Sequence, residues 1–204
     1  MKPIAEPTTA RGRATRQRIL RAAEQCFGEH GYAEASVAEI VRRSGVAQGS
    51  FYNYFESKAA IFAELIRSLG RQMTDATREG AERAKNGSRV EAEVEGTKGF
   101  LSWLTEHRDL HRLLHLIDEA DPSLAVEFFG GFAEGYAEAL EEAMGEGEVQ
   151  RIDPELLAFA LMGMNHFVSM RWILWDREGE MSPQLMDDFA RIIAGALRGA
   201  APER

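Results

Sequence analysis

The polar and apolar positions of the first 60 residues repeat every three to four residues, which predicts short helices. From Thr15 onward the apolar positions share one face and arginines occupy the other, until Gly31 supplies a stop. Ser36 is suited to cap a second helix, with Glu39 as its capping-box partner, and that helix ends at 44–45. The N-terminal region therefore predicts two amphipathic helices in succession.

The residues that follow predict a tight turn and a third helix. Gly45 is able to adopt the positive φ that a short turn between helices needs, and Val46 fills the angle between them. The third helix is expected over about 48–54, with Phe51 and Phe55 facing inward because they lie four residues apart. Its polar residues are then left for an exposed face.

Capping residues and prolines mark the helices of the remaining chain. Ser57 caps a fourth helix, which continues to the break at 86–88. An Asp or Ser directly precedes a proline at 121–122, 153–154 and 182–183, and each pair marks a helix start. Runs of alternating polarity are few, so we predict an all-α fold of nine helices. The last five are expected at about 89–107, 110–119, 122–145, 154–176 and 183–199.

Composition narrows the class of protein. The 204 residues are enough for one or two domains, and the single cysteine, Cys26, lies on the apolar face of the first helix as an expected core residue. The longest uncharged apolar run, 156–170, has 15 residues, whereas a membrane span needs about 20. No apolar stretch follows the basic N-terminus as in a signal peptide. We therefore expect a cytoplasmic protein without a membrane partner.

The net charge of −9 is distributed unevenly along the chain. Residues 1–60 hold nine Lys and Arg against six acidic residues, a net charge of +3, and the other 144 residues have a net charge of −12. A basic segment of this kind can hold phosphates while the acidic remainder keeps the protein off other polyanions. The alternative from charge alone is an unevenly charged solvated surface.

Two ordered strings in this region, TRQRILRAAEQCFGEHGY and ASVAEIVRRSGVAQGSFYNYFESKAAIF, resemble the DNA-binding domain of the tetracycline-repressor (TetR) family of bacterial transcription regulators. The resemblance covers residues 15–66, about a quarter of the chain. It implies a TetR-like architecture with a flexible basic arm over 1–14, a helix-turn-helix domain over 15–60, and a ligand-binding and dimerisation domain over 61–204.

The third helix carries the expected base contacts. It is short enough for its N-terminal residues to reach base edges in the major groove. Gln48 is suited to pair bidentately with adenine, and Ser50 can donate to or accept from a base edge. Gly49 lets the backbone approach closely. Asn53 is left open between a phosphate, a base and water alone.

Expected phosphate contacts surround these residues. Tyr52 and Tyr54 carry hydroxyls on rigid arms, and the resemblance implies that they hold phosphates; the alternative for one of them is a half-buried core aromatic. Lys58 adds a charge beside the amides that open the fourth helix, and Ser36 occupies the corresponding place on the second helix.

Arg11 and Arg13 lie before the predicted first helix, spaced around a glycine. In an arm such arginines can enter the narrow minor groove, where the negative potential is enhanced. A solvated terminus that contributes only long-range attraction is the equal alternative.

The last two helices are the expected dimer interface. The helix that begins at Pro154 is apolar nearly all round and must be covered on every side. The resemblance implies that these helices pair with a second copy, giving a two-fold dimer that matches a palindromic operator. The expected interface residues are Trp172, Trp175, Leu185, Phe189, Ile192, Ile193 and Leu197.

An aromatic and Met-rich set with a few polar members is the expected ligand site, and it suits an apolar ligand. The alternative is a solid core, in which Asn165 and His166 form hydrogen bonds with one another or with the dimer interface. The body loosely resembles regulators that sense acyl-CoA thioesters, whereas its acidity equally suits a hydrophobic cation held by Asp118, Glu119 or Glu134. The set is Phe100, Trp103, Leu104, Leu116, Phe128, Phe132, Tyr136, Met162, Asn165, His166 and Met170.

The histidines at 107, 111 and 115 follow a four-residue spacing that places imidazoles on one helix face, with Glu119 as a fourth ligand for a metal. However, Asp109 is a good N-cap, so His107 is assigned to the preceding helix and no metal or cofactor is expected.

The prediction is thus a homodimeric repressor that an apolar small molecule, with acyl-CoA as one candidate, releases from operator DNA. The first rival is a helical-bundle enzyme, but the sequence shows no catalytic nucleophile and general base at a convincing spacing. The second rival is a ligand-free architectural DNA binder. The acidic body and its aromatic interior argue against the second.

Overall fold

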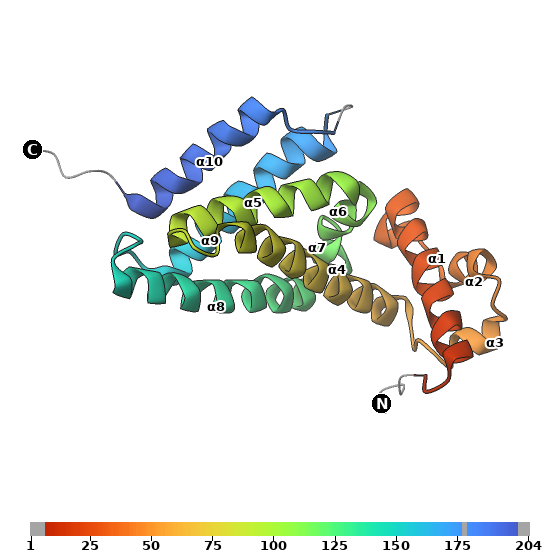
Figure 1. The fold of residues 1–204 in the computed structure, drawn as a ribbon. Coiled ribbons are helices and arrows are strands. Elements are labelled where there is room, and N and C mark those ends of the chain that lie inside the picture. The colour runs from red at the N-terminus through yellow and green to blue at the C-terminus, as the bar shows by residue number, and fades with distance from the viewer. Residues whose placement is uncertain (1–6, 177–178, 200–204) are drawn as a thin grey trace, which may run out of the picture. The chain divides into compact units, whose positions relative to one another are not determined.

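Helices are the regular elements of residues 7–176 and 179–199, the part of the chain that the computed structural model describes, and no strand occurs there (Figure 1). The prediction of an all-α fold is confirmed. The α-helices are α1 (Ala10–Glu34), α2 (Val37–Ser44), α3 (Gln48–Phe51), α4 (Lys58–Ala81), α5 (Arg89–Glu106), α6 (Arg108–Leu114), α7 (Ile117–Ala120), α8 (Pro122–Glu146), α9 (Pro154–Ser169) and α10 (Pro183–Arg198). A 3-10 turn, η1 (Glu82–Ala84), follows α4, and a π-helix, η2 (Met170–Leu174), extends α9.

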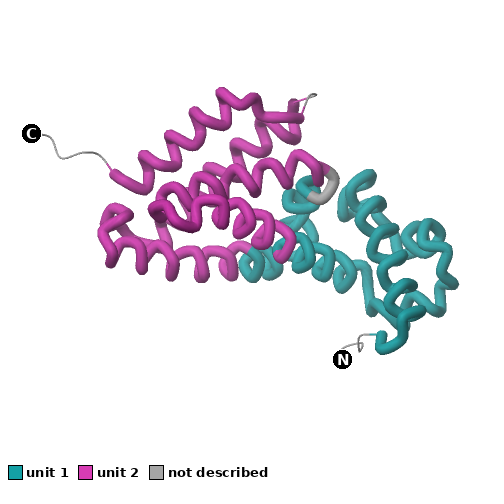
Figure 2. Tube along the Cα trace, viewed as in Figure 1, with its two compact units in different colours: residues 1–70, 109–128 teal, residues 71–108, 129–204 magenta. Residues whose placement is uncertain are grey.

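The chain forms two compact units (Figure 2). The first contains residues 1–70 and 109–128, and the second contains 71–108 and 129–204. The first unit therefore combines the predicted DNA-binding segment with the start of α4, with α6 and α7, and with the start of α8. The functional division into 1–14, 15–60 and 61–204 stays a prediction, because compactness does not test where DNA or a ligand binds.

Short-range hydrogen bonds confirm several predicted helix starts. The Ser36 hydroxyl accepts from the Glu39 amide at 3.2 Å, and the Ser57 hydroxyl accepts from the Ala60 amide at 3.1 Å. Asp153 and Ser182 cap α9 and α10 in the same way, each just before a proline. These starts follow from residues within one helical turn.

The first helix begins earlier than predicted. Thr9 is its N-cap, and its hydroxyl accepts from the Gly12 amide at 3.1 Å, so Arg11 and Arg13 lie in the first turn of α1 and not in an arm before it. Thr15, the predicted start, is inside the helix and donates its hydroxyl to the Arg11 carbonyl. Of the rest of the predicted arm, residues 7–9 precede the helix and residues 1–6 lie outside the described residues.

Other helix boundaries also differ from the prediction. The helix expected over 48–54 ends at Phe51 and gives way to turns. The helix expected over 110–119 is divided into α6 and α7, which raises the number of α-helices from nine to ten in the described chain. The helix expected over 154–176 is α-helical to Ser169 and then widens into the π-helix η2.

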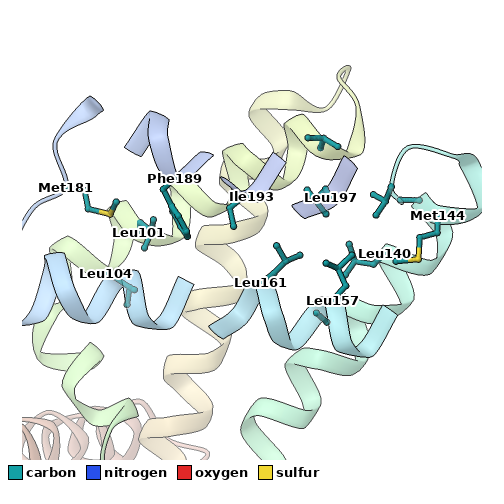
Figure 3. Packing of buried hydrophobic residues seen from close by; sticks show 14 of the residues in the cluster. Leu101, Leu104, Leu140, Met144, Leu157, Leu161, Met181, Phe189, Ile193 and Leu197 are labelled. Atoms are coloured by element: carbon teal, nitrogen blue, oxygen red, sulfur yellow. The ribbon is translucent and has the colours of Figure 1, made fainter. Parts of the chain in front are cut away.

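The core of the second unit collects apolar side chains from α5, α8, α9 and α10 (Figure 3). The inward face of α10 packs on α5, and Phe189, Ile193 and Leu197 are at most 4% exposed. These three residues are therefore core residues, which corrects their assignment to a dimer interface. The periodicity had shown that this face is apolar, but the chain itself covers it.

The end of α4 crosses α5 with the two backbones nearly touching. A Cβ added at Gly99 would lie 2.7 Å from the Ala76 carbonyl oxygen and 2.9 Å from the Gly80 Cα. Since real Cβ atoms do not approach so closely, glycine is required at this crossing.

The outer face of α9 is apolar and exposed. Together α9 and η2, Pro154–Leu174, are long and apolar enough to cross a membrane by length and composition, with a mean hydropathy of 1.2. Their inward residues Leu157 and Leu161 belong to the core, whereas several large apolar side chains on α9, after η2 and on α10 remain exposed. These exposed residues are Leu156, Phe159, Phe167, Trp175 and Ile192.

Candidate nucleic-acid interface

The turn between α2 and α3 has the geometry that the sequence predicts. Gly45 ends α2 in the left-handed conformation, with φ 64° and ψ 26°. Val46 is buried beside it, and the chain enters α3 from Ala47. Phe51 is fully buried and Phe55 nearly so, which fixes α3 against the core of the first unit.

The expected base-reading residues face outward from this anchored turn. Gln48, Gly49 and Asn53 are exposed and Ser50 is half-buried. All four lie within one short stretch of α3 and the turn after it. The structure thus brings the predicted base contacts together on one accessible edge, while their roles stay predictions.

The two tyrosines have different surroundings. The Tyr52 side chain is 50% exposed and its ring meets the Phe51 ring edge-on at 5.3 Å. Tyr54 is half-buried. Tyr52 therefore fits an outward phosphate contact, and Tyr54 matches the alternative of a half-buried aromatic.

Lys58 is already bound within the protein. Its Nζ donates to the carbonyls of Tyr32 at 2.7 Å and Ala33 at 3.1 Å, and it lies 4.4 Å from the centroid of the Tyr32 ring. An ammonium has three donor hydrogens, so a phosphate contact by Lys58 would share the group with these carbonyls.

Carboxylates neutralise the basic end of α2. Arg42 donates to both Glu39 carboxylate oxygens, and Arg43 donates to Glu39 and Glu29. Hydrogen bonds from Arg42 and then Arg43 lower the pKa of Glu39 to about 2. This ion-pair network ties α2 to α1, because Glu29 belongs to α1.

A basic stripe on α1 reaches further toward the N-terminus than the arginine face that the sequence predicts from Thr15 onward. Because the helix begins at Ala10, Arg11, Arg18 and Arg21 are separated by seven and three residues and lie within one face. All three side chains are exposed. Arg18 and Arg21 lie on the predicted arginine face, whereas Arg11 joins them only because the helix begins at Ala10.

The predicted ligand residues are divided between the two units. Leu116 and Phe128 belong to the first unit, whereas the other nine belong to the second. Leu104 is fully buried in the core of the second unit, with Phe100 and Trp103 packed against that core. Assignment of any of the eleven to a ligand stays a prediction.

Tyr136, another of these residues, belongs to a buried polar cluster that the sequence did not reveal. Its hydroxyl donates to the carboxylate of Glu93, which is 9% exposed and accepts from Arg89 at 3.2 Å. Burial and the neighbouring Glu93 charge raise the pKa of Tyr136 well above its ordinary value. The four-residue spacing of Arg89 and Glu93 predicts an ion pair on one helix, but it does not show that the Glu93 carboxylate is buried.

Two of the polar candidates lie side by side on α9. The Asn165 amide donates to the Leu161 carbonyl at 3.0 Å inside the helix, and burial lowers the pKa of His166. Met162 and Met170 are half-buried on the same helix and at the start of η2.

The three histidines divide between the units. His107 is the C-cap of α5 in the second unit, as its assignment to the preceding helix predicts, and its ring stacks on Trp103 at 4.4 Å. His111 and His115 belong to the first unit, with ring centroids 5.6 Å apart. Among the described residues, no three His, Cys, Asp or Glu side chains gather as a metal site.

Taken together, a capped α2, a left-handed glycine, and a short α3 with buried aromatics and an exposed polar edge define a helix-turn-helix protein. Residues 19–65 match the family model described as bacterial regulatory proteins, tetR family. This part of the chain is therefore a DNA-binding domain of the TetR family.

Relatives agree with this assignment, most strongly over the helix-turn-helix. The uncharacterized HTH-type transcriptional regulator YdgC of Bacillus subtilis is 51% identical over 57 residues, which are 28% of this chain and 29% of that protein. The A-factor receptor protein of Streptomyces griseus is 30% identical over 158 residues, or 73% of this chain and 51% of that protein. The matched region thus spans less than two thirds of these relatives.

Solved structures share the fold over nearly the whole chain. Salmonella enterica GusR has a TM-score of 0.76 at 22% identity, covering 97% of this chain and all of that one. The transcriptional regulator FadR from Bacillus subtilis, in complex with stearoyl-CoA, has a TM-score of 0.70 at 20% identity, covering 89% of this chain and 98% of that one. At these identities the likeness shows the fold.

Proposed function

We propose that the protein is a transcriptional repressor that binds palindromic operator DNA through α3 and is released by an apolar small molecule. The observation that carries this proposal is the exposed polar edge of Gln48, Gly49, Ser50 and Asn53, held on a buried aromatic anchor in a helix-turn-helix of the TetR family. Relatives named as HTH-type repressors, including AcnR of Corynebacterium glutamicum, support repression over the rival of a helical-bundle enzyme.

Phosphate contacts are assigned around this edge. Tyr52 is the exposed aromatic beside it, and Ser36 opens α2 nearby in the sequence. The basic stripe of Arg11, Arg18 and Arg21 adds positive charge on α1, which suits a polyanion. Arg13 is exposed in the same first turn, and its guanidinium donates to the Thr8 carbonyl.

A second copy of the chain is the proposed partner of the exposed face of α9. Leu156, Phe159 and Phe167 lie 3 and 8 residues apart, so they occupy one face of the helix. Trp175 and Ile192 add exposed apolar area after η2 and on α10. Exposed apolar faces of this kind often mark interaction sites, and a two-fold dimer would cover it.

The remaining predicted interface residues contribute less. Trp172 and Leu185 are half-buried against the core of the second unit, so only part of each side chain is available to a partner. The interface proposed here therefore depends mainly on α9, in place of the buried face of α10.

An acyl-CoA thioester is the first proposed ligand and a hydrophobic cation the second. FadR from Bacillus subtilis, which shares the fold, holds stearoyl-CoA, and the second unit is rich in aromatic and Met residues. The cation alternative rests on the acidic body, where Glu134 is exposed on α8. A cytoplasmic location accompanies this function.

The proposal is tested by selecting bound DNA from a random pool with the full-length protein. Enrichment of a palindrome with half-sites about one helical turn apart, roughly 34–36 Å, is the expected result. Recovery without sequence preference would favour the architectural DNA binder. Stearoyl-CoA and a hydrophobic cation are then titrated separately against the selected complex, and release by one of them identifies the ligand class.

A further inference from the structure

The end of α1 is held by side chains from two other helices of the first unit. Gly31, with φ 74°, interrupts the helix, so the backbone groups that follow need partners from outside the regular ladder. Lys58 of α4 donates to the carbonyls of Tyr32 and Ala33. Glu119 of α7 accepts from the Ala33 amide at 3.2 Å. We refer to Tyr32 and Ala33 as the joint.

Aromatic packing fixes the joint from its side-chain side. The Tyr32 ring stacks on Phe27 with centroids 5.8 Å apart and meets Phe62 of α4 at 5.0 Å. Phe27 and Phe62 are almost fully buried. The joint is therefore a defined piece of structure in which α1, α4 and α7 converge.

The third helix of this arrangement comes from a distant part of the sequence. The chain leaves the second unit after residue 108 and returns to it at 129, and only the intervening segment, 109–128, packs in the first unit with residues 1–70. Glu119 connects that segment to α1 across 86 positions. Glu127 connects it to α4 through a bidentate pair with Arg67, at 2.8 and 3.0 Å.

We propose that the segment 109–128 positions the DNA-binding helices through the joint, and that Glu119 is the positioning residue. Both ends of the segment continue into the second unit, so a rearrangement there reaches the joint along the chain. Leu116 and Phe128, two of the predicted ligand residues, lie within the same segment. The inference rests on the proposed operator binding, which supplies the activity that the joint controls.

The physical consequence of losing this contact is a looser head, defined as residues 10–57. A dimer that grips two half-sites must order both heads at a fixed spacing, and ordering a loosened segment costs free energy on binding. The cost arises only when both half-sites are bound together. Glu119→Ala should therefore weaken binding to the full palindrome about five- to 150-fold, the effect of losing one hydrogen bond in each of the two subunits, while binding to a single half-site is unchanged.

The first test measures the joint without DNA. Hydrogen exchange of the Ala33 amide is followed by NMR in the unmodified protein, in Glu119→Ala and in Glu119→Gln, whose amide oxygen still accepts a hydrogen bond. Asp118→Ala is the matched control because it removes the neighbouring exposed carboxylate of α7. Faster exchange in Glu119→Ala alone supports the joint. Unchanged exchange in Glu119→Ala, or equal acceleration in Asp118→Ala, would overturn it.

The second test measures positioning with DNA. Affinities for the selected palindrome and for a half-site duplex are compared among the same variants. A selective loss on the palindrome in Glu119→Ala, restored in Glu119→Gln, supports the positioning role, whereas equal losses on both duplexes overturn it. If the unmodified protein binds no palindrome, the proposed function fails, and the exchange measurement still decides whether Glu119 holds the joint.

Discussion

Phe167→Glu provides a direct test of the proposed dimer. Phe167 is 67% exposed on the outer face of α9, with Leu156 and Phe159 on the same face. The substitution removes apolar area and places a carboxylate where a second copy would cover it. Because the residue projects outward, the fold of the monomer does not depend on it, and the effect should be confined to association.

The magnitude follows from the exposed area. A large aromatic side chain buries about 200 Å² when fully covered, so two thirds of that area, about 130 Å², is available at Phe167. At about 25 cal/mol per Å² this corresponds to about 3 kcal/mol for each copy. A two-fold interface contains the residue twice, so the loss is about 6 kcal/mol, or roughly 10⁴-fold in the dimer dissociation constant. Burying the new carboxylate would add to it.

Sedimentation equilibrium of the purified variants measures this change, with circular dichroism to confirm helical content. Val126→Glu is the control, since Val126 is 75% exposed on α8 and lies outside the proposed interface. Phe189→Glu should instead unfold the second unit, because Phe189 is 4% exposed in its core. A monomeric unmodified protein at micromolar concentration, or a Phe167→Glu variant that still dimerises normally, would refute the argument. Partition of the unmodified protein into lipid vesicles would instead assign the α9 face to a membrane.

Four further predictions follow from other parts of the molecule. Gln48→Ala should cost about 1–3 kcal/mol at one base position, measured by binding to operator variants; equal losses on operator and random DNA would contradict base reading. If Lys58 shares its ammonium with a phosphate, Lys58→Ala should lower the salt slope of binding by about 1 per half-site, and an unchanged slope would assign it to the joint alone. Because the pKa of Glu39 is lowered to about 2, its ion pairs stabilise the fold above about pH 5 and are lost as the pH falls through 2, so Glu39→Gln should flatten the stability measured by urea unfolding in that range. Gly99→Ala should destabilise the protein by about 1–3 kcal/mol through overpacking, whereas Gly135→Ala, where an added Cβ meets nothing within 4 Å, should stabilise it by about 0.5–1 kcal/mol; thermal unfolding distinguishes the two.

The DNA-binding segment shows how far local chemistry determines structure. Ser36 caps α2 by a hydrogen bond from the amide of Glu39, three residues further along the chain. Gly45 adopts a left-handed conformation in which most other residues would be strained. Phe51 and Phe55 are buried as their spacing predicts. Each of these features depends on neighbours in sequence, so the sequence alone was sufficient to predict the helix-turn-helix and its exposed polar edge.

The start of α1 could not be predicted from capping preferences alone. Thr9 and Thr15 are both acceptable caps by residue type, and the choice between them decides whether Arg11 lies in an arm or on a helix. The structure places the start at Thr9, which aligns Arg11 with Arg18 and Arg21. Capping preference ranks residue types, but it does not choose between two equivalent candidates.

Contacts between distant segments were decided only by the tertiary structure. The apolar period of α10 predicted an apolar face, but whether Phe189 meets its own chain or a second copy depends on where α5 lies. The same holds for Glu93, which forms a buried cluster with Tyr136, and for Glu119, which reaches the Ala33 amide from 86 positions away. Periodicity specifies which face of a helix must be covered. Which segment covers that face depends on packing between parts of the chain that are far apart in sequence. Neither part carries a local pattern that identifies the other.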